Sequence, residues 1–202
     1  TGVKEVVLTG IHISSYGTDL ENISLIELIE AIHEIEGIKR IRLGSLEPRI
    51  ITDEFAKRLS EISSICPHFH LSLQSGSDSV LKRMNRHYTS EQYLEGVKIL
   101  EKYFENPAIT TDIIVGFPME TEDEFVETLK FVNEVRFAQI HVFKYSRRQG
   151  TAADKMDGQI AESEKSARSE RLIEKEKVLE SEFRERALKN EEKVLFEEIT
   201  QI

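Results

Sequence analysis

Three short segments of the chain combine glycine with polar or aromatic side chains, and each follows an apolar run typical of a β-strand. Residues 9–12 read TGIH, residues 74–77 read QSGS, and residues 116–118 read GFP. Parallel strands in α/β proteins hold ligands beyond their carboxyl ends, and the N-terminus of a following helix attracts anions. The three segments therefore predict one ligand site, assembled at one end of a parallel sheet.

Gln74 and Asp112 are candidates to bind a polar ligand at this site. Gln74 lies between an apolar strand and a Gly turn, so its amide is expected to point into a pocket that holds a ribose or an amino acid. Asp112 lies within the apolar run ITTDIIV, and a carboxylate in a buried strand needs partners. Ligand binding and a structural hydrogen bond to a neighbouring strand explain Asp112 equally well.

Glu47 and His12 each have an ordinary structural explanation beside a functional one. Glu47 precedes Pro48, which holds it extended and gives its carboxylate a fixed direction. This carboxylate is expected either to accept a hydrogen bond from a ligand or to form an ion pair with Arg49 or Arg42. His12 is expected either to contact a ligand or RNA or to form a hydrogen bond within its own turn.

Two groups of basic residues are candidates to contact a polyanion, although ordinary solvated surface clusters explain them too. The first lies on a helix predicted to continue to residue 87, and the second ends the fifth predicted strand. The candidates are Arg83 and Arg86 in the first group, and Lys144, Arg147 and Arg148 in the second. The net charge of −10 and the pI of about 5.2 argue against nucleic-acid binding by the whole surface, though not by a local patch.

The single cysteine, Cys66, excludes an internal disulfide and a metal site built from several cysteines of this chain. No pattern marks it as activated, so a structural thiol is the favoured interpretation. No apolar run is long enough to span a membrane and no signal peptide is recognisable, so no membrane partner is expected. The composition is typical of a cytoplasmic protein.

Strands alternate with helices along most of the chain, which predicts βα units and a parallel sheet. Five strands are too few for a standard eight-stranded barrel, so either an open doubly wound sheet or an incomplete barrel is expected. The predicted strands cover residues 5–8, 38–43, 68–73, 109–115 and 138–145. The predicted helices between them cover residues 24–35, 52–62, 89–104 and 121–135.

The composition changes near Gly158. Residues 162–192 are rich in charged side chains and contain neither Gly nor Pro, which predicts a long solvated helix packed along one side of the domain. Residues 194–202 are predicted to begin another strand. The chain starts almost directly in a strand and without Met, so we expect it to be a piece of a longer protein.

The order and spacing of five motifs carry a specific resemblance. The motifs are YGxDL, SxEP, LQSGSxxVLKxMxRxYT, TDxIVGFPxETExEF and YSxRxGT, in this order. Over residues 1–158 the chain resembles the radical SAM methylthiotransferases. The resemblance implies a partial (β/α)6 barrel lacking its first strand in residues 1–158, a helical linker in residues 159–192, and the start of a TRAM-like domain in residues 193–202.

The resemblance also implies an activity. These enzymes use S-adenosylmethionine and 4Fe-4S clusters to generate a radical and to add a methylthio group to carbon 2 of a modified adenosine beside the tRNA anticodon. The segments TGIH and SLEP are similar to the branch acting on N6-threonylcarbamoyladenosine; the isopentenyladenosine branch is the alternative. The implied partners are tRNA and an electron donor for cluster reduction. The family's CxxxCxxC motif is not in this chain, so the chain alone is expected to hold no cluster and to be inactive.

The resemblance implies a set of cofactor contacts. Gly10 and its loop would lie near the methionine end of S-adenosylmethionine. Glu47, Gln74 and Asp112 would line its ribose and amino-acid region, and residues 115–117 and 143–145 would border the adenine. The residues expected to bind the cofactor are Gly10, Glu47, Gln74, Ser75, Asp112, Gly116, Phe143 and Tyr145.

Two further hypotheses remain open beside the resemblance. The first is an α/β enzyme that binds a phosphate-containing ligand at the 74–77 turn and the helix N-terminus after it. The second is a non-catalytic RNA-binding module that uses the two basic groups. Independently of function, a strand at residues 5–9 that lacks a partner on one side is expected to promote self-association through its exposed edge.

Overall fold

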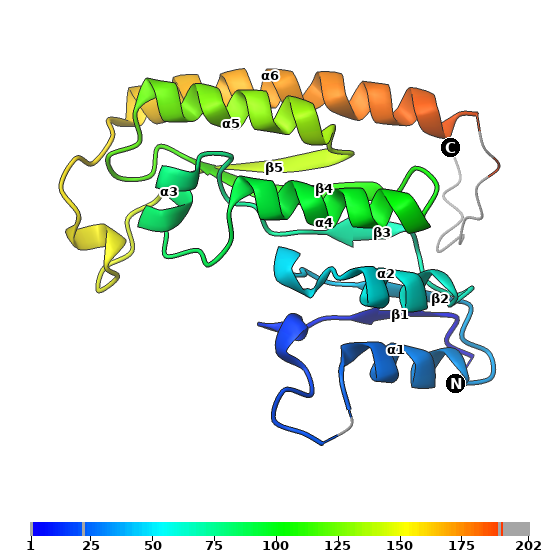
Figure 1. Ribbon diagram of the computed structural model, residues 1–202. Coiled ribbons are helices and arrows are strands. Elements are labelled where there is room, and N and C mark those ends of the chain that lie inside the picture. The colour runs from blue at the N-terminus through cyan, green and yellow to red at the C-terminus, as the bar shows by residue number, and fades with distance from the viewer. Residues whose placement is uncertain (1, 22, 190, 192–202) are drawn as a thin grey trace.

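The computed structural model describes residues 2–21, 23–189 and 191. Within them lie five β-strands, all in the regions expected from the sequence, although β3 is only half as long as expected (Figure 1). The strands are β1 (Glu5–Leu8), β2 (Arg40–Leu43), β3 (His68–His70), β4 (Ala108–Val115) and β5 (Gln139–Lys144). The strand expected in residues 194–202 and the TRAM-like start lie outside the described residues.

All strand pairs that the structure describes are parallel. β1 pairs with β2, while β3, β4 and β5 form a second sheet in that order. Isolated parallel bridges, Ile41 to Ile65 and Leu46 to Leu71, link the β2 segment to the β3 segment. The strands therefore lie side by side in chain order, as in an incomplete barrel. In a doubly wound sheet, the spatial order of the strands would instead reverse partway along the chain.

Six α-helices connect and cover these strands in the described chain. They are α1 (Leu25–His33), α2 (Asp53–Ser60), α3 (Asp78–Arg83), α4 (Ser90–Tyr103), α5 (Glu122–Val135) and α6 (Glu162–Ala187). Threonines begin three of them: the Thr52, Thr89 and Thr121 hydroxyls accept hydrogen bonds from the backbone N–H three residues later. The capping boxes at Thr89 and Thr121 stabilise the starts of α4 and α5.

The helix expected to carry the first basic group is shorter than predicted. α3 ends at Arg83, and Asn85 adopts a left-handed conformation with φ 57°. A left-handed residue ends an α-helix because it turns the chain out of the helical path. Arg86 and His87 therefore lie in the connection to α4, and the prediction that they share a helix with Arg83 was wrong.

The two faces of the second sheet differ in chemistry. Side chains alternate along a strand, so one face of β4 carries Ile109, Ile113 and Val115, which are buried against the helices. The opposite face carries the half-buried Asp112 and Ile114. α6 runs along the outer side of β5 and beside α5 (Figure 1). The inner face of the partial barrel therefore carries polar side chains beside apolar ones such as Ile114.

β1 has a partner on one side only among the described residues. Its other edge carries backbone N–H and C=O groups without a ladder, and Val7 there is 56% exposed. Self-association through this edge stays a prediction. None of the helices within the described residues combines the length and apolar character that crossing a membrane requires.

Candidate functional site

A hollow of about 530 Å³ opens at the carboxyl ends of β3, β4 and β5. Four of the residues predicted to bind a cofactor line it: Gln74, Asp112, Phe143 and Tyr145. Arg148 from the second basic group also lies on its wall. Because the parallel register aligns these strand ends, residues far apart in the sequence meet around one space. Of the three segments predicted to form one site, residues 74–77 contribute Gln74 to its lining, whereas residues 9–12 and 116–118 do not line it.

Gln74 occupies a backbone conformation that is rare for a side-chain-bearing residue. Its φ is 72°, in the left-handed region. The sheet enforces this conformation, since Gln74 N–H donates to the Asp112 carbonyl at 2.9 Å and the Gln74 carbonyl accepts from Ile114 N–H at 2.9 Å. Strained backbone of this kind clusters at ligand sites. Here it places the amide side chain on the wall of the hollow.

Asp112 faces two histidines from the neighbouring strands. It is the register partner of His141 on β5, and its Oδ2 lies 3.6 Å from His70 Nε2 on β3. Burial lowers the pKa of His70 and the Asp112 carboxylate acts to raise it; burial prevails, so the neutral imidazole is favoured. The Asp112 carboxylate thus contacts a neighbouring strand at a separation longer than the hydrogen bond expected from the sequence, and it also lines the hollow.

Tyr145 closes the hollow beside an aromatic neighbour. Its ring meets that of Phe117 edge to face at a centroid separation of 5.3 Å. Two hydrogen bonds hold its backbone: Tyr145 N–H donates to the Val115 carbonyl at 2.8 Å, and the Tyr145 carbonyl accepts from Lys165 Nζ at 3.0 Å. Its buried hydroxyl has no hydrogen-bond partner among the described residues. A buried phenol without a partner costs stability unless a ligand or water satisfies it.

Gly116 is required by packing as much as by its turn. Its φ is 72°, and a Cβ added there would lie 2.4 Å from Cγ of Lys165. Its N–H donates to Glu120 Oε2 at 2.6 Å, and that carboxylate also pairs with Arg168 Nη1 at 2.7 Å. Lys165 and Arg168 belong to α6, so the expected solvated helix supplies two nearly buried cations behind the site. The sequence analysis missed both because they lie within a run of surface charges.

The remaining predicted cofactor residues lie outside this hollow. Ser75 is buried, and its hydroxyl lies 3.3 Å from that of Thr128 on α5. Gly10 is exposed in the loop after β1. Glu47 Oε1 lies 2.9 Å from His12 Nε2, and Glu47 Oε2 lies 3.5 Å from Arg49 Nη2. The structural alternative for Glu47, an ion pair with Arg49, is thus present.

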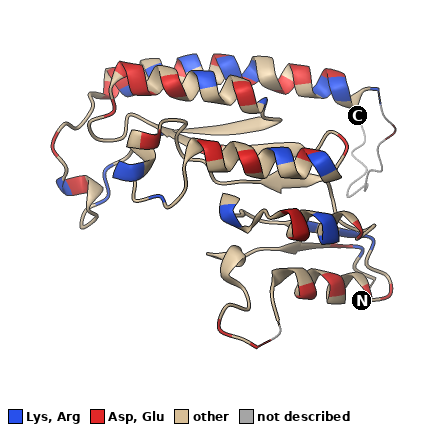
Figure 2. Ribbon diagram, viewed as in Figure 1, with Lys and Arg blue, Asp and Glu red and all other residues tan. Residues whose placement is uncertain are grey.

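Most of the predicted polyanion-binding residues already have acidic partners. Arg83 makes two hydrogen bonds to Glu124, at 2.9 and 2.6 Å. Burial acts to raise the pKa of Glu124, but the bonds from Arg83 and Ser79 outweigh it and lower this pKa to about 2. Arg147 pairs with Asp154 at 2.9 Å, and Lys144 pairs with Glu162 at 2.5 Å. Acidic and basic side chains also alternate along α6 (Figure 2).

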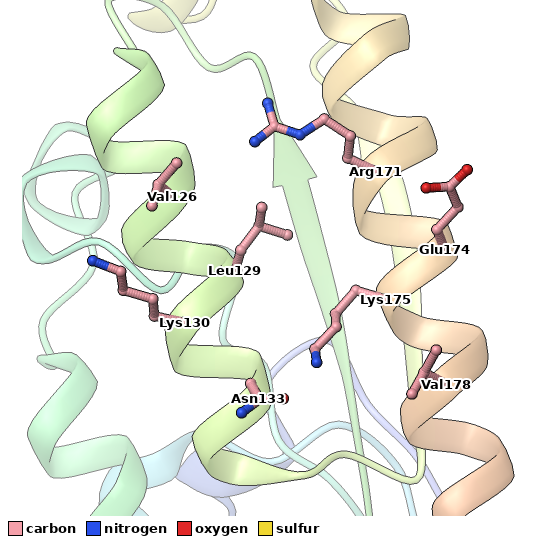
Figure 3. A pocket seen from close by; sticks show the side chains of 8 residues that line it. All are labelled: Val126, Leu129, Lys130, Asn133, Arg171, Glu174, Lys175 and Val178. Atoms are coloured by element: carbon pink, nitrogen blue, oxygen red, sulfur yellow. The ribbon is translucent and has the colours of Figure 1, made fainter.

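A second hollow, of about 670 Å³, lies on the outer side of the sheet between α5 and α6. Figure 3 shows Leu129, Arg171 and Lys175 extending into the space between the two helices. Arg171 Nη1 is already bonded to Glu122 at 2.6 Å. This groove contains none of the residues predicted to bind a ligand, so we place the candidate site at the 530 Å³ hollow.

Comparison with known proteins gives relatives of one kind. A family model described as the radical SAM superfamily matches residues 1–132. The chain is 46% identical over 173 residues to the threonylcarbamoyladenosine tRNA methylthiotransferase MtaB of Bacillus subtilis, covering 85% of this chain and 38% of the relative. It is 42% identical over 196 residues to the MtaB of Thermotoga maritima, covering 97% of this chain and 45% of the relative. It is also 46% identical over 174 residues to the tRNA-2-methylthio-N(6)-dimethylallyladenosine synthase of a Thermoanaerobacter species, covering 86% and 37%.

Solved structures share the fold at low sequence identity. Coproporphyrinogen III oxidase (HemN) from Escherichia coli aligns with a TM-score of 0.59 and 18% identity, over 74% of this chain and 36% of that one. Methylornithine synthase (PylB) aligns with a TM-score of 0.58 and 16% identity, over 87% and 49%. The chain spans less than half the length of the curated relatives it matches.

Proposed function

The chain belongs to the radical SAM superfamily, and on this premise we propose that it forms most of the cofactor-binding barrel of a tRNA methylthiotransferase. Members of this superfamily use S-adenosylmethionine together with a 4Fe-4S cluster. One observation carries the assignment of the site: Gln74, Asp112 and Tyr145, from three different strand segments, converge on one hollow at the carboxyl edge of a parallel sheet. This edge is where α/β folds bind their ligands.

The residues of the hollow fit S-adenosylmethionine. The Gln74 amide and the Asp112 carboxylate offer hydrogen bonds to ribose hydroxyls or to the methionine ammonium group. The buried Tyr145 hydroxyl has no partner among the described residues, which a polar ligand group would supply. Phe143 is 53% exposed on the same wall, so its ring is free to stack against a purine. When bound, the cofactor supplies the adenosyl group and the methyl group of the reaction.

The chain does not fit the iron–sulfur cluster. A site-differentiated cluster needs three thiolates, whereas the sequence contains one cysteine, and Cys66 is buried before β3. Burial raises the pKa of its thiol, which disfavours the thiolate that binds iron. We therefore assign no cluster ligand to these residues and expect this chain alone to be inactive. The cluster, its electron donor and a cytoplasmic location belong to the proposed whole enzyme.

The substrate we propose is tRNA carrying N6-threonylcarbamoyladenosine, to which a methylthio group is added at carbon 2. Two segments support this branch over the isopentenyladenosine branch, TGIH at residues 9–12 and SLEP at residues 45–48. They touch each other through the contact between His12 and Glu47, so they form one local surface. Arg148, on the wall of the hollow, and the half-buried Arg86 are the basic residues we favour for tRNA contact, because the other three have acidic partners.

A chimera tests this function. Residues of this chain replace the aligned 196-residue segment of the Thermotoga maritima relative, which is 42% identical. Expressed in cells that lack the modification, the chimera is expected to yield methylthiolated threonylcarbamoyladenosine in tRNA, measured by mass spectrometry of nucleosides. A product on isopentenyladenosine would reassign the branch. A folded chimera with full cluster content and neither product would refute the function.

Two substitutions in the chimera test the site. Gln74→Ala and Asp112→Asn are expected to weaken S-adenosylmethionine affinity, by about 0.5–1.5 kcal/mol for a neutral hydrogen bond and more for a charged one, at unchanged cluster content. Arg171→Ala, in the outer groove, is the matched control and is expected to leave affinity unchanged. Unchanged affinity with a lower melting temperature would make the substituted residue structural.

A further inference from the structure

Two imidazoles and one carboxylate converge on the inner face of the partial barrel. His70, Asp112 and His141 each offer one ligand atom, and these atoms all lie within 4.8 Å of one another. The His70 Nε2 to Asp112 Oδ2 distance is 3.6 Å, longer than an ordinary hydrogen bond. The rings of His70 and His141 are stacked with centroids 6.1 Å apart.

We propose that His70, Asp112 and His141 bind a single divalent transition-metal ion, a site distinct from any iron–sulfur cluster. Zn²⁺ and related ions take imidazole nitrogen and carboxylate oxygen at about 2.0–2.2 Å, which places neighbouring ligand atoms about 3.0–3.5 Å apart. The His70–Asp112 pair is already near that separation. A rotation of the exposed His141 side chain brings its ring nitrogen, the third ligand atom, close enough to bind the same ion.

Rigid strands supply all three ligands. Asp112 and His141 are directly opposite each other in the parallel register of β4 and β5. His70 pairs with Thr110, two residues before Asp112, so it lies diagonally across the neighbouring strand on the same face. Ligands fixed on paired strands lose little freedom on binding an ion, which favours affinity.

The Thr110 hydroxyl orients the His70 ring. Its Nδ1 lies 3.1 Å from Thr110 Oγ1. In the tautomer whose Nδ1–H donates to this hydroxyl oxygen, the lone pair is on Nε2, the atom that faces Asp112. Metal-binding histidines characteristically have their second nitrogen held in this way.

The site leaves room for the proposed cofactor. Monodentate metal binding uses one oxygen of Asp112, and the other remains available to a ligand in the hollow that Asp112 lines. Three protein ligands also leave coordination positions open toward that hollow, as in sites where an ion binds water or substrate. Asp112 is common to both sites, whereas His70 and His141 do not line the hollow. The inference does not depend on the proposed function, because ion binding is measured on the chain itself.

The test uses the 202-residue chain, stripped of metal with a chelator. Zn²⁺ binding is measured by calorimetry and Co²⁺ binding by visible absorption. We expect one equivalent of each ion. Thr110→Val removes a group that holds a ligand without binding the ion itself, and it is expected to lower the affinity for Zn²⁺ roughly 10–100-fold. His141→Ala and Asp112→Asn each remove a ligand, and both are expected to lower this affinity by more. His87→Ala removes an exposed histidine outside the cluster and is expected to change nothing.

The results that would overturn the proposal are equally specific. Because His141 is exposed, its alanine variant is expected to fold, and circular dichroism checks this. Sub-stoichiometric binding, or unchanged affinity in folded His141→Ala, would refute the site. A thiolate-to-cobalt charge-transfer band would assign the ion to Cys66 instead. In the chimera, His141→Ala leaves cofactor affinity intact if the two sites are separate, whereas Gln74→Ala leaves Zn²⁺ affinity intact.

Discussion

His12 Nε2 lies 2.9 Å from Glu47 Oε1, so the loop after β1 and the loop after β2 are joined at the carboxyl edge of the sheet. Glu47 N–H also donates to Ser14 Oγ at 2.9 Å, which ties the same two loops a second time. These residues are 33 to 35 positions apart in the sequence. Two loops that carry the branch resemblance therefore form one structural unit.

The first prediction concerns the ionisation of Glu47. Its pKa is lowered chiefly by the hydrogen bond from His12, with a smaller contribution from Arg49. His12→Ala is expected to raise this pKa toward its usual range, measured by NMR titration of the side-chain carboxyl. Because the folded-state pKa is lowered, the stabilisation involved is present at neutral pH and is lost as the pH falls through that value. An unchanged Glu47 pKa would show that Arg49 alone sets it.

The second prediction concerns the buried pair of Arg168 and Glu120, whose side chains are 2% and 1% exposed. Arg168→Ala leaves the carboxylate buried without its cation, which is expected to cost about 3–5 kcal/mol of unfolding free energy. The exposed pair of Arg171 and Glu122 is the control, and Arg171→Ala is expected to cost under about 1 kcal/mol. Chemical denaturation of both variants measures the difference.

The same pair has a pH signature. Burial raises the pKa of Glu120 despite the opposing bonds from Gly116 and Arg168. Removing Arg168 raises it further, so protonation relieves the buried charge as the pH falls. The stability gap between Arg168→Ala and the unaltered chain is therefore expected to narrow on acidification. A gap that widens toward acid would contradict this account.

The third prediction separates the backbone of Gln74 from its side chain. Its φ of 72° is unfavourable for glutamine by about 1 kcal/mol or more, whereas glycine adopts it without this cost. Gln74→Gly is thus expected to melt at a higher temperature than Gln74→Ala, because only glycine relieves the strain. Both variants lose the amide and are expected to bind S-adenosylmethionine equally weakly in the chimera. Equal melting temperatures would mean that the turn is not strained.

The fourth prediction concerns the contact between Gly116 and α6. Gly116→Ala places a Cβ against Cγ of Lys165 and adds left-handed strain, so a loss of about 1–3 kcal/mol is expected. Lys165→Ala in the same chain removes the clash but not the strain, and partial recovery is expected. A double-mutant cycle of unfolding free energies measures the coupling. If the two substitutions change the unfolding free energy additively, the Lys165 side chain moves away from the added Cβ without cost.

The fifth prediction concerns the edge of β1. Unpaired strand edges promote association, and lysine on an edge strand opposes it. Sedimentation of the chain is expected to show concentration-dependent association that Val7→Lys reduces, because Val7 is exposed there. Lys4→Gln, which leaves the apolar edge intact, serves as the control. A chain that sediments as a monomer at all concentrations would contradict the prediction.

The sequence alone determined the elements and their kind. Local periodicity marks a strand or helix whatever the rest of the chain does, so β1, β2, β4 and β5 and the helices between them appear within a few residues of their expected ends. β3 is shorter than expected because its later residues pair alternately with both neighbours, Leu71 with Leu46 and Gln74 with Ile113. The ordered motifs were also sufficient to identify the family, since they depend only on residue types and their spacing along the chain.

Only the tertiary structure decided which side chains meet. Asp112 faces His70 and His141 because the parallel register sets β3 and β5 against β4, and register depends on contacts between distant segments. The strained turn at Gln74 and the two buried cations of α6 arise in the same way. Local sequence encodes the direction and burial period of an element, whereas a site is made by the alignment of several elements, which folding of the whole chain sets.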